Sequence, residues 1–218
     1  MEKEKIKKLD SWFNAICSEI EASYHIPITC RGGTVIDCGS NAGGFPVVFN
    51  ARFDRYICYE ADPDNHGYSK KKIKQLAFPQ FNLSEICTFE NKACYKNGGE
   101  TVSIYRHNNE VSGDNSIYEG KDHPAENKIT EVKTVSIEDI KEKYFCDKCL
   151  RPIELLKCDI EGAEYDFLLN KDLSIFKFMI VETHDRAGKE APMHELIDFI
   201  SKTHNVGVVD RVLTAWPK

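Results

Sequence analysis

The sequence has no long apolar run and no excess of positive charge. None of its segments approaches the roughly 20 apolar residues that a membrane-spanning helix needs. The opening residues, MEKEKIKKLD, contain no apolar core of a secretory signal. Lysine and arginine number 29 against 35 aspartates and glutamates, a formal net charge of -6. Because nonspecific nucleic-acid binding depends on positively charged faces, we expect a cytoplasmic protein with neither a membrane nor a nucleic acid as its main partner.

The cysteines lack the pattern of a disulfide framework or of a zinc site. Their number, nine, is odd. Cys146 and Cys149 have the C-x-x-C spacing of metal and redox motifs, but a structural zinc needs four ligands and no second pair follows. We expect loop thiols there, with a metal or redox role as the alternative. Four others lie in apolar, strand-like runs, where a reduced thiol fills the core as a small hydrophobe: Cys38, Cys58, Cys87 and Cys158.

Hydrophobic periodicity predicts the order of the elements. Apolar residues recur every three or four positions between Ile6 and Ile20, which indicates an amphipathic helix within residues 1–25. Short apolar runs then alternate with helical segments, as in a parallel sheet built from βαβ units. The predicted strands of this sheet are 34–38, 56–59, 86–89, 153–159 and 178–182.

Residues 97–137 interrupt the alternation. They contain two β-rich runs around a polar loop, 106–128, and predict a small antiparallel insertion. Two short runs at residues 206–216 predict one or two closing strands. Since no repeat or linker breaks the pattern, we expect one α/β domain over residues 1–218 with a doubly wound, mostly parallel sheet.

Acidic residues stand at the ends of successive predicted strands, where a doubly wound sheet binds its ligands. They are Asp37, Glu60, Glu90, Asp159 and Glu182. The first strand is also followed by a glycine-rich turn, which lets the backbone approach a ligand closely. The glycines of this turn do not fit the G-x-G-x-x-G pattern of dinucleotide-binding proteins. The acid after the second strand stands where a carboxylate can accept hydrogen bonds from both ribose hydroxyls of an adenosine.

Two segments resemble class I methyltransferases of the FkbM type. Residues 35–43, VIDCGSNAG, are similar to that family's D-x-G-x-N-x-G loop, and residues 156–164, LKCDIEGAE, to its K-x-D-x-E-G-A-E block. The similarity extends over about residues 34–184. The sequence departs from the family at Ala61, where proline is usual, and in a short C-terminal end that leaves little room for two closing antiparallel strands.

The resemblance implies a Rossmann-like fold that binds S-adenosylmethionine and methylates hydroxyl groups of sugars or other small metabolites. By position in the family's motifs, the loop after the first strand would line the methionine part of the cofactor. Glu60 would bind the ribose, and residues near Asn91 would border the adenine. The full expected cofactor set is Asp37, Gly39, Ser40, Asn41, Gly43, Glu60, Ala61, Asn91, Lys92, Ala93 and Asp159.

Methylation of a neutral hydroxyl requires a group that removes its proton. His184 is the first candidate for this base, since the ordinary imidazole pKa of about 6.5 suits proton removal near neutral pH. Asp159 is the second candidate, as base or as a cofactor contact, and Glu161 completes the expected catalytic group. Structural roles are the alternatives, with His184 capping a helix and Asp159 holding the turn at Gly162. We expect no metal, although these side chains could instead gather Mg²⁺.

Two other functions stay open at this point. The chain could be a cofactor-binding domain without catalysis that serves as an interaction module. It could also be a nicotinamide-dependent oxidoreductase, which shares the fold but not the glycine pattern. The expected partner is a small-molecule or carbohydrate acceptor, recognised by loops 106–128 and 186–192. The sequence specifies neither the acceptor nor the oligomeric state.

Overall fold

The structure is a computed structural model of the chain. It describes residues 2–76, 82–107, 115–119, 123–145, 153–185 and 192–218, with side chains from residue 6 onward. Cys146 and Cys149, residues 108–114 and 120–122 of the polar loop of the insertion, and residues 186–191 of the second expected acceptor loop lie outside the described residues.

A seven-stranded sheet forms the centre of the fold, in the order β3-β2-β1-β7-β8-β10-β9. The first five strands in this order are parallel, and β10 is antiparallel to both β8 and β9. The chain therefore extends the sheet in one direction from β1 and in the other from β7, as the doubly wound prediction requires. The strands are β1 (Thr34–Cys38), β2 (Arg55–Tyr59), β3 (Cys87–Glu90), β7 (Ile153–Cys158), β8 (Phe176–Glu182), β9 (His204–Val209) and β10 (Val212–Pro217).

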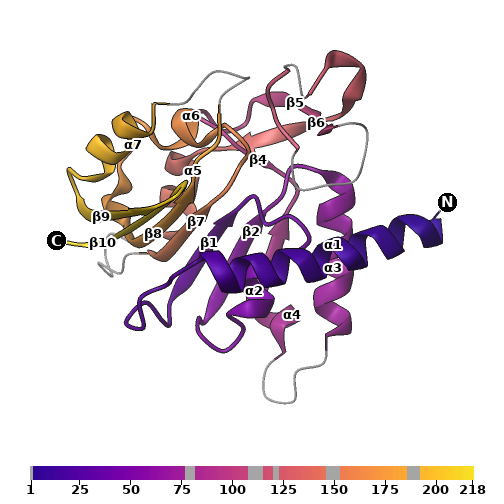
Figure 1. The fold of residues 1–218 in the computed structure, drawn as a ribbon, viewed down its shortest axis with the longest axis horizontal. Helices are drawn as coiled ribbons and strands as arrows, with labels where there is room; N and C mark the ends of the chain where they lie inside the picture. Colours follow the sequence, from indigo (N-terminus) through magenta and orange to yellow (C-terminus); the bar gives the residue numbers. More distant parts are fainter. Residues whose placement is uncertain (1, 77–81, 108–114, 120–122, 146–152, 186–191) are drawn as a thin grey trace.

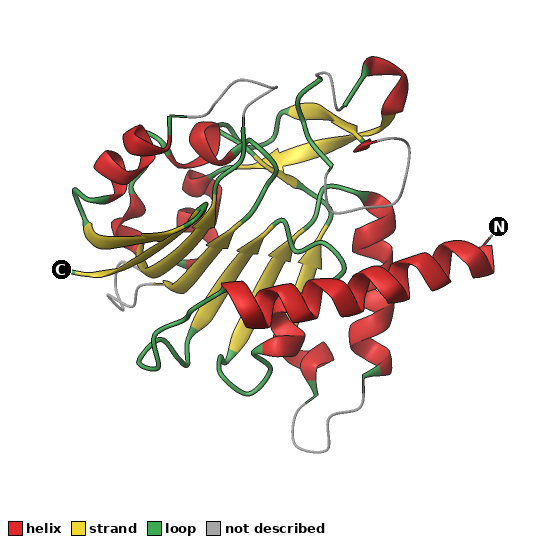
Figure 2. Ribbon diagram, viewed as in Figure 1, coloured by secondary structure: helices red, strands yellow, loops and turns green. Residues whose placement is uncertain are grey.

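Helices cover both faces of this sheet (Figures 1 and 2). One face packs on α1 (Glu2–Ser23), α2 (Gly44–Val48) and α3 (Pro63–Gln75), and the other on α5 (Ile137–Tyr144), α6 (Glu164–Leu168) and α7 (Met193–Ile200). Successive strand residues point to opposite faces, so Val35 and Leu155 join the α1 side while Ile36 and Leu156 join the α5 side. The remaining helical turns are α4 (Leu83–Ile86), Ala125–Asn127 and Leu173–Ile175. None of the helices in the described part of the chain has both the length and the apolar composition needed to cross a membrane.

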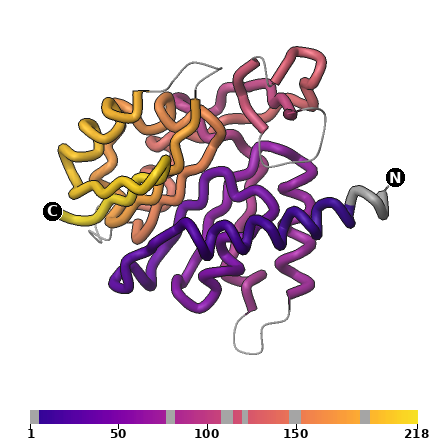
Figure 3. The backbone as a smooth tube through the Cα atoms, in the orientation of Figure 1, coloured from indigo at the N-terminus to yellow at the C-terminus, as the bar shows by residue number. Residues whose placement is uncertain are grey.

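A second, three-stranded sheet lies beyond the carboxyl ends of the parallel strands (Figure 3). Its antiparallel pair, β5 (Thr101–Tyr105) with β6 (Lys128–Val135), occupies the predicted insertion. The sheet also takes in β4 (Ala93–Cys94), which pairs in parallel with β6 and precedes the predicted boundary at residue 97. The periodicity missed β4 because a two-residue strand has no recognisable pattern.

Two expectations need correction. Despite the short C-terminal end, both closing strands form, because a two-residue turn lets β9 and β10 pair along six residues. Cys38, Cys58 and Cys158 are fully buried as expected, but Cys87 is only half-buried, since it starts the edge strand β3.

Gly39 brings the turn after β1 against the turn after β7. Its φ is +72°, in the region that favours glycine, and a Cβ built there would lie 1.8 Å from the carbonyl oxygen of Asp159. No side chain fits at this position. The two turns that carry most of the predicted site residues can therefore meet only because residue 39 is glycine.

We expect Gly39→Ala to lower the free energy of unfolding by more than Gly99→Ala does. Gly99 has a similar φ of +75° with nothing near its Cβ position, so its substitution reports only the backbone strain, about 1–2 kcal/mol. The collision at Gly39 should add about 1–3 kcal/mol. Urea unfolding of both variants measures the difference, and equal losses would contradict the close packing of the two turns.

Candidate active site

The carboxyl ends of β1, β2, β7 and β8 bring most of the predicted site residues to one edge of the sheet. Two cavities open there. The first lies between the turns after β1 and β2 and the small sheet. It is lined by Gly39, Asn41, Tyr59, Glu60, Ala61, Lys92, Ala93, Cys94, Ile104, Asn115, Ile117, Asp159, Ile160, Glu161 and Ala163.

The second cavity lies between α1 and the ends of β7 and β8. Its lining comprises Trp12, Ile16, Glu19, Ile20, Tyr24, Gly39, Ser40, Asn41, Phe45, Lys157, Asp159, Glu161, Glu182 and His184. Gly39, Asn41, Asp159 and Glu161 border both cavities. The two cavities therefore lie side by side, with these four residues forming part of the lining of each.

Glu60 is held at the end of the first cavity by the backbone. Its carboxylate accepts hydrogen bonds from the backbone N–H of Asn41 (2.7 Å) and of Asp62 (2.8 Å). Asn41 adopts the left-handed region, with a φ of 50°, which turns its N–H toward this carboxylate. Burial raises the pKa of Glu60 to about 8, although both N–H groups favour the charged form. Further hydrogen-bond donors would therefore stabilise the charged form of Glu60.

Several predicted residues shape this cavity without lining it. Asn91 donates from Nδ2 to the carbonyl oxygens of Glu60 (2.8 Å) and Ala61 (2.9 Å), and so fixes the turn after β2. Gly43 precedes α2 with a φ of +82°. Lys92 and Ala93 do line the cavity, whereas Ser40 lines the second one.

Lys157 lies beneath the junction of the two cavities, and its side chain is almost fully buried. Its ammonium donates to the carbonyl oxygen of Gly39 (2.7 Å) and lies 3.5 Å from Asp37 and 3.3 Å from Asp159. Burial opposes its charge, but Asp159 and Asp37 outweigh that cost and raise the pKa of Lys157. Asp37 itself has no exposed surface and lines neither cavity. Its position supports a role through Lys157 rather than in ligand contact.

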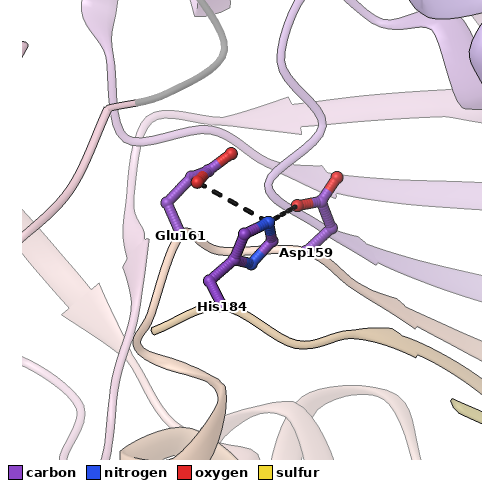
Figure 4. A group of neighbouring side chains, drawn as sticks. All are labelled: Asp159, Glu161 and His184. Carbon is purple, nitrogen blue, oxygen red and sulfur yellow. Dashed lines mark ion pairs between the residues drawn. The ribbon is translucent and has the colours of Figure 1, made fainter. Parts of the chain in front are cut away.

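His184 stands among four carboxylates. Figure 4 shows two of them, Asp159 and Glu161, beside the imidazole. Its Nδ1 lies 3.0 Å from Glu164, which has no exposed surface. Its Nε2 lies 3.7 Å from Glu161 and 3.9 Å from both Asp159 and Glu182. Partial burial disfavours the imidazolium, but the bond to Glu164 and the surrounding charges raise the pKa of His184 to about 10. The ordinary imidazole pKa assumed from the sequence does not apply here, because the ring carries a proton at neutral pH in this arrangement.

Two residues near the end of β7 contribute in ways that the motifs do not indicate. Glu164 accepts hydrogen bonds from the backbone N–H of Ile160 (3.0 Å) and of Gly162 (3.0 Å), so the turn around Glu161 wraps about its carboxylate. Tyr24 directly follows α1, and its hydroxyl lies 2.9 Å from Glu182 and 3.2 Å from Asp159.

Asp159, Glu161 and His184 offer ligand atoms within 4.8 Å of one another, a spacing that could hold a metal ion.

Helix α1 forms one wall of the second cavity, a position that its periodicity alone did not predict. Besides the contacts of Tyr24, the indole of Trp12 donates to Asn41 Oδ1 (3.2 Å). Two residues before Trp12, Asp10 accepts hydrogen bonds from Tyr68 (2.6 Å) and Lys72 (2.7 Å) of α3. The helix is therefore attached both to the fold and to the loop after β1.

The described part of the insertion covers the first cavity rather than the second. We call residues 115–118 the strap. Ser116 of the strap donates to the carbonyl oxygen of Glu161 (2.9 Å), and Asn115 donates to Asp62 (3.0 Å). Arg106 pairs with the same aspartate at 2.7 Å. The described residues of this insertion therefore contact the cavity that contains Glu60, and the expectation that loop 106–128 recognises the acceptor stays a prediction.

The whole chain was compared with known families and structures. A family model described as the methyltransferase FkbM domain matches residues 37–207. The crystal structure of methyltransferase FkbM from Methylobacillus flagellatus KT is similar in fold, with a TM-score of 0.54 and 17% identity over 89% of this chain and 45% of that chain. This chain thus spans less than half the length of that protein. A comparison with curated proteins gives no match.

Weaker likenesses extend to two other solved structures. Precorrin-6y C5,15-methyltransferase from Geobacter metallireducens GS-15 has a TM-score of 0.47 and 8% identity, over 88% of this chain and 85% of that one. TrmK from M. capricolum, in complex with S-adenosyl-homocysteine, has a TM-score of 0.41 and 9% identity, over 84% of this chain and 60% of that one.

We expect Lys157→Met to destabilise the protein by about 3–5 kcal/mol, because it leaves Asp37 buried without its cation. Adding Asp37→Asn should recover part of the loss by removing the unpaired charge. Lys177→Met is the matched control: Lys177 pairs with Glu154 at 3.2 Å but is partly exposed, so about 0–1 kcal/mol is expected. Urea unfolding near pH 7 measures all three. If Lys157→Met and Lys177→Met lower the free energy of unfolding by similar amounts, the buried pair of Lys157 and Asp37 contributes no more to stability than the partly exposed pair does.

Proposed function

Since this chain belongs to the FkbM methyltransferase family, we propose that it binds S-adenosylmethionine across the two cavities and methylates a hydroxyl group of a sugar or another small metabolite. The observation that carries the proposal is the meeting of the two cavities at Gly39, Asn41, Asp159 and Glu161. One end offers a buried acid for a ribose, and the other offers a group of ionisable side chains. This separation suits a cofactor with a nucleoside end and a reactive end.

The residues present fit this cofactor. In the first cavity, Glu60 is positioned to accept hydrogen bonds from ribose hydroxyls, with Ala61, Lys92 and Ala93 beside it. Toward the second cavity, Ser40 has a buried hydroxyl without a hydrogen-bond partner among the described residues, as expected where a polar ligand supplies the missing contact. The glycine at position 39 leaves the backbone of this turn accessible between the two.

Several predicted cofactor residues would act indirectly. Asp37 would fix Lys157, Asn91 would fix the turn that carries Glu60, and Gly43 would start α2. S-adenosylmethionine, when bound, supplies a methyl group on a sulfonium, which is already a reactive donor. The protein's own task is therefore to align the acceptor and to exclude water. The apolar side chains of α1 would exclude water from the second cavity, and the acids at the ends of β7 and β8 would align the acceptor.

The second cavity supports a hydroxylated ring as the acceptor. Its lining combines the apolar side chains of Trp12, Ile16, Ile20 and Phe45 with the acids Glu19, Asp159, Glu161 and Glu182. A sugar ring offers matching groups, with C–H groups on its face and hydroxyl donors at its edge. This match favours a carbohydrate or a similar small metabolite as the acceptor.

The proton of the acceptor hydroxyl has carboxylate groups to receive it. The pKa of Asp159 is lowered: burial alone would raise it, but the charges of Lys157 and His184 prevail, so its carboxylate is ionised at neutral pH. We propose that Asp159 and Glu161 hold the hydroxyl and accept its proton as the new C–O bond forms. His184, in its protonated form, would offset the charge of these acids and keep them apart.

We expect methyl transfer from S-adenosylmethionine to be detectable in metabolite mixtures treated with the protein, as a gain of one methyl group. With the acceptor found in this way, His184→Ala should lower turnover by roughly 10²-fold or more while S-adenosylhomocysteine still binds. Calorimetry and turnover together check both parts. Binding without transfer to any acceptor would favour the non-catalytic interaction module instead.

We expect Glu60→Gln to weaken S-adenosylhomocysteine binding by about 1–3 kcal/mol, since it removes a charged hydrogen-bond acceptor. The wild type should also bind more tightly as the pH rises. The empty site keeps a proton on Glu60 up to its pKa of about 8, whereas ribose hydroxyls favour the ionised form. Binding therefore releases that proton, and affinity should rise by up to about tenfold per pH unit below this pKa.

Calorimetry between about pH 6 and pH 9 measures this slope. Glu60→Gln should lack it, while the amino group of the ligand titrates identically in both proteins. Glu90→Gln is the matched control, because Glu90 also ends a strand but pairs with Lys143 (2.7 Å) and Lys92 (2.9 Å). An unchanged affinity and slope in Glu60→Gln would remove Glu60 from the cofactor site.

A further inference from the structure

Besides its proposed role in proton transfer, the group around His184 has the construction of a cation site. We infer that Asp159, Glu161 and His184 form a binding site for a divalent cation of the Mg²⁺ or Mn²⁺ class. The inference deepens the proposed function, on which it rests for the use of the cation, but the binding itself can be measured without any acceptor.

The three side chains converge on one point from two strand ends (Figure 4). Asp159 and Glu161 follow β7, and His184 follows the neighbouring parallel strand β8. Two ligand atoms that each lie about 2.1 Å from an ion are at most about 4.2 Å apart. The distances from His184 Nε2 to Asp159 Oδ1, 3.9 Å, and to Glu161 Oε2, 3.7 Å, satisfy this limit. Both are longer than a hydrogen bond, and the ligand atoms of all three side chains lie within 4.8 Å of one another, so a slight approach of the two carboxylates would complete the fit.

The imidazole is oriented for coordination by a buried partner. Glu164 has no exposed surface and lies 3.0 Å from His184 Nδ1. A bound cation would take the place of the proton that Nε2 carries when no ion is present. The contact with Glu164 then keeps the other proton on Nδ1 and directs the lone pair of Nε2 toward the two carboxylates. Metal-binding histidines are commonly held in this way, by a carboxylate on the nitrogen that does not bind the metal. Since Glu164 is itself fixed by the N–H groups of Ile160 and Gly162, the support is rigid.

A second observation in the same cavity also points to a ligand. Ser40 is 3% exposed, and its hydroxyl has no hydrogen-bond partner among the described residues. It lines the second cavity together with the three proposed ligands and with Glu182, whose Oε1 lies 3.9 Å from His184 Nε2. An orphan hydroxyl beside an incomplete coordination sphere suits a hydrated cation, whose water molecules need hydrogen-bond acceptors and donors around them.

The donor set selects the class of ion. Two carboxylates and one imidazole, without a thiolate among them, suit Mg²⁺ or Mn²⁺, which prefer oxygen ligands and keep several water molecules. All three side chains line the second cavity, so water molecules or an acceptor in that cavity would complete the coordination. An acceptor hydroxyl that replaced one of those waters would have its pKa lowered by the cation, which favours loss of its proton to a neighbouring carboxylate.

The full chain, freed of metal by chelator and gel filtration, is titrated with Mn²⁺ and followed by electron paramagnetic resonance. We expect one bound Mn²⁺ per chain, displaced by Mg²⁺. Asp159→Asn and Glu161→Gln should each weaken binding at least tenfold, and Glu164→Gln should weaken it about 10–100-fold through the orientation of His184. Glu138→Gln is the matched control, because Glu138 is an exposed carboxylate on α5 outside both cavities. It should bind Mn²⁺ as the wild type does.

The proposed site is wrong if the wild type binds Mn²⁺ no more tightly than exposed surface carboxylates do. It is also wrong if each of the three variants binds Mn²⁺ as tightly as the wild type does. Circular dichroism checks the folding of each variant, and Glu161→Gln keeps the test decisive if Asp159→Asn does not fold, since Glu161 lies in a turn and is partly exposed. The same samples are titrated with S-adenosylhomocysteine. Cofactor binding without Mn²⁺ binding rejects the cation site alone, whereas Mn²⁺ binding without cofactor binding rejects the proposed function alone.

Discussion

The ammonium group of Lys157, buried where β1 meets β7, is the contact on which the rest of the site depends. Its strand register places it directly opposite Asp37, and it also binds the carbonyl oxygen of Gly39 and the carboxylate of Asp159. Burying each of these charges alone would cost several kcal/mol. Together they fix the two turns that border both cavities. The acids at the end of β7 can face a cavity because this cation lies behind them.

Charge compensation continues outward from that lysine. The two carboxylate oxygens of Asp159 face different partners. Oδ2 lies near Lys157 and Tyr24, and Oδ1 lies near the imidazole of His184. Glu182 is less well compensated: burial and the charge of Asp159 raise its pKa. The cavity therefore carries more negative charge than its own cations offset. A positively charged ligand, whether a sulfonium or a metal ion, is favoured there by electrostatics alone.

The sequence predicted what local patterns determine. Strand ends and the glycine turn follow from alternation and from glycine's freedom, and the family match confirms the expected fold and family. The sequence could not predict that Tyr24, which follows α1, contacts Asp159 and Glu182. These acids lie 135 and 158 positions further along the chain. The pKa of His184 was missed for a related reason: Glu164 and Glu182 approach it only after folding.

The strap and α1 belong to separate parts of the chain. Both lie near the residues that border both cavities, Gly39, Asn41, Asp159 and Glu161. The strap contacts Asp62 and the turn at Glu161 above the first cavity, while α1 borders only the second. Changes in one wall thus leave the other intact. In evolutionary terms the fold is modular: the side of α1 that lines the second cavity can diverge in sequence while the strap and the first cavity are inherited unchanged.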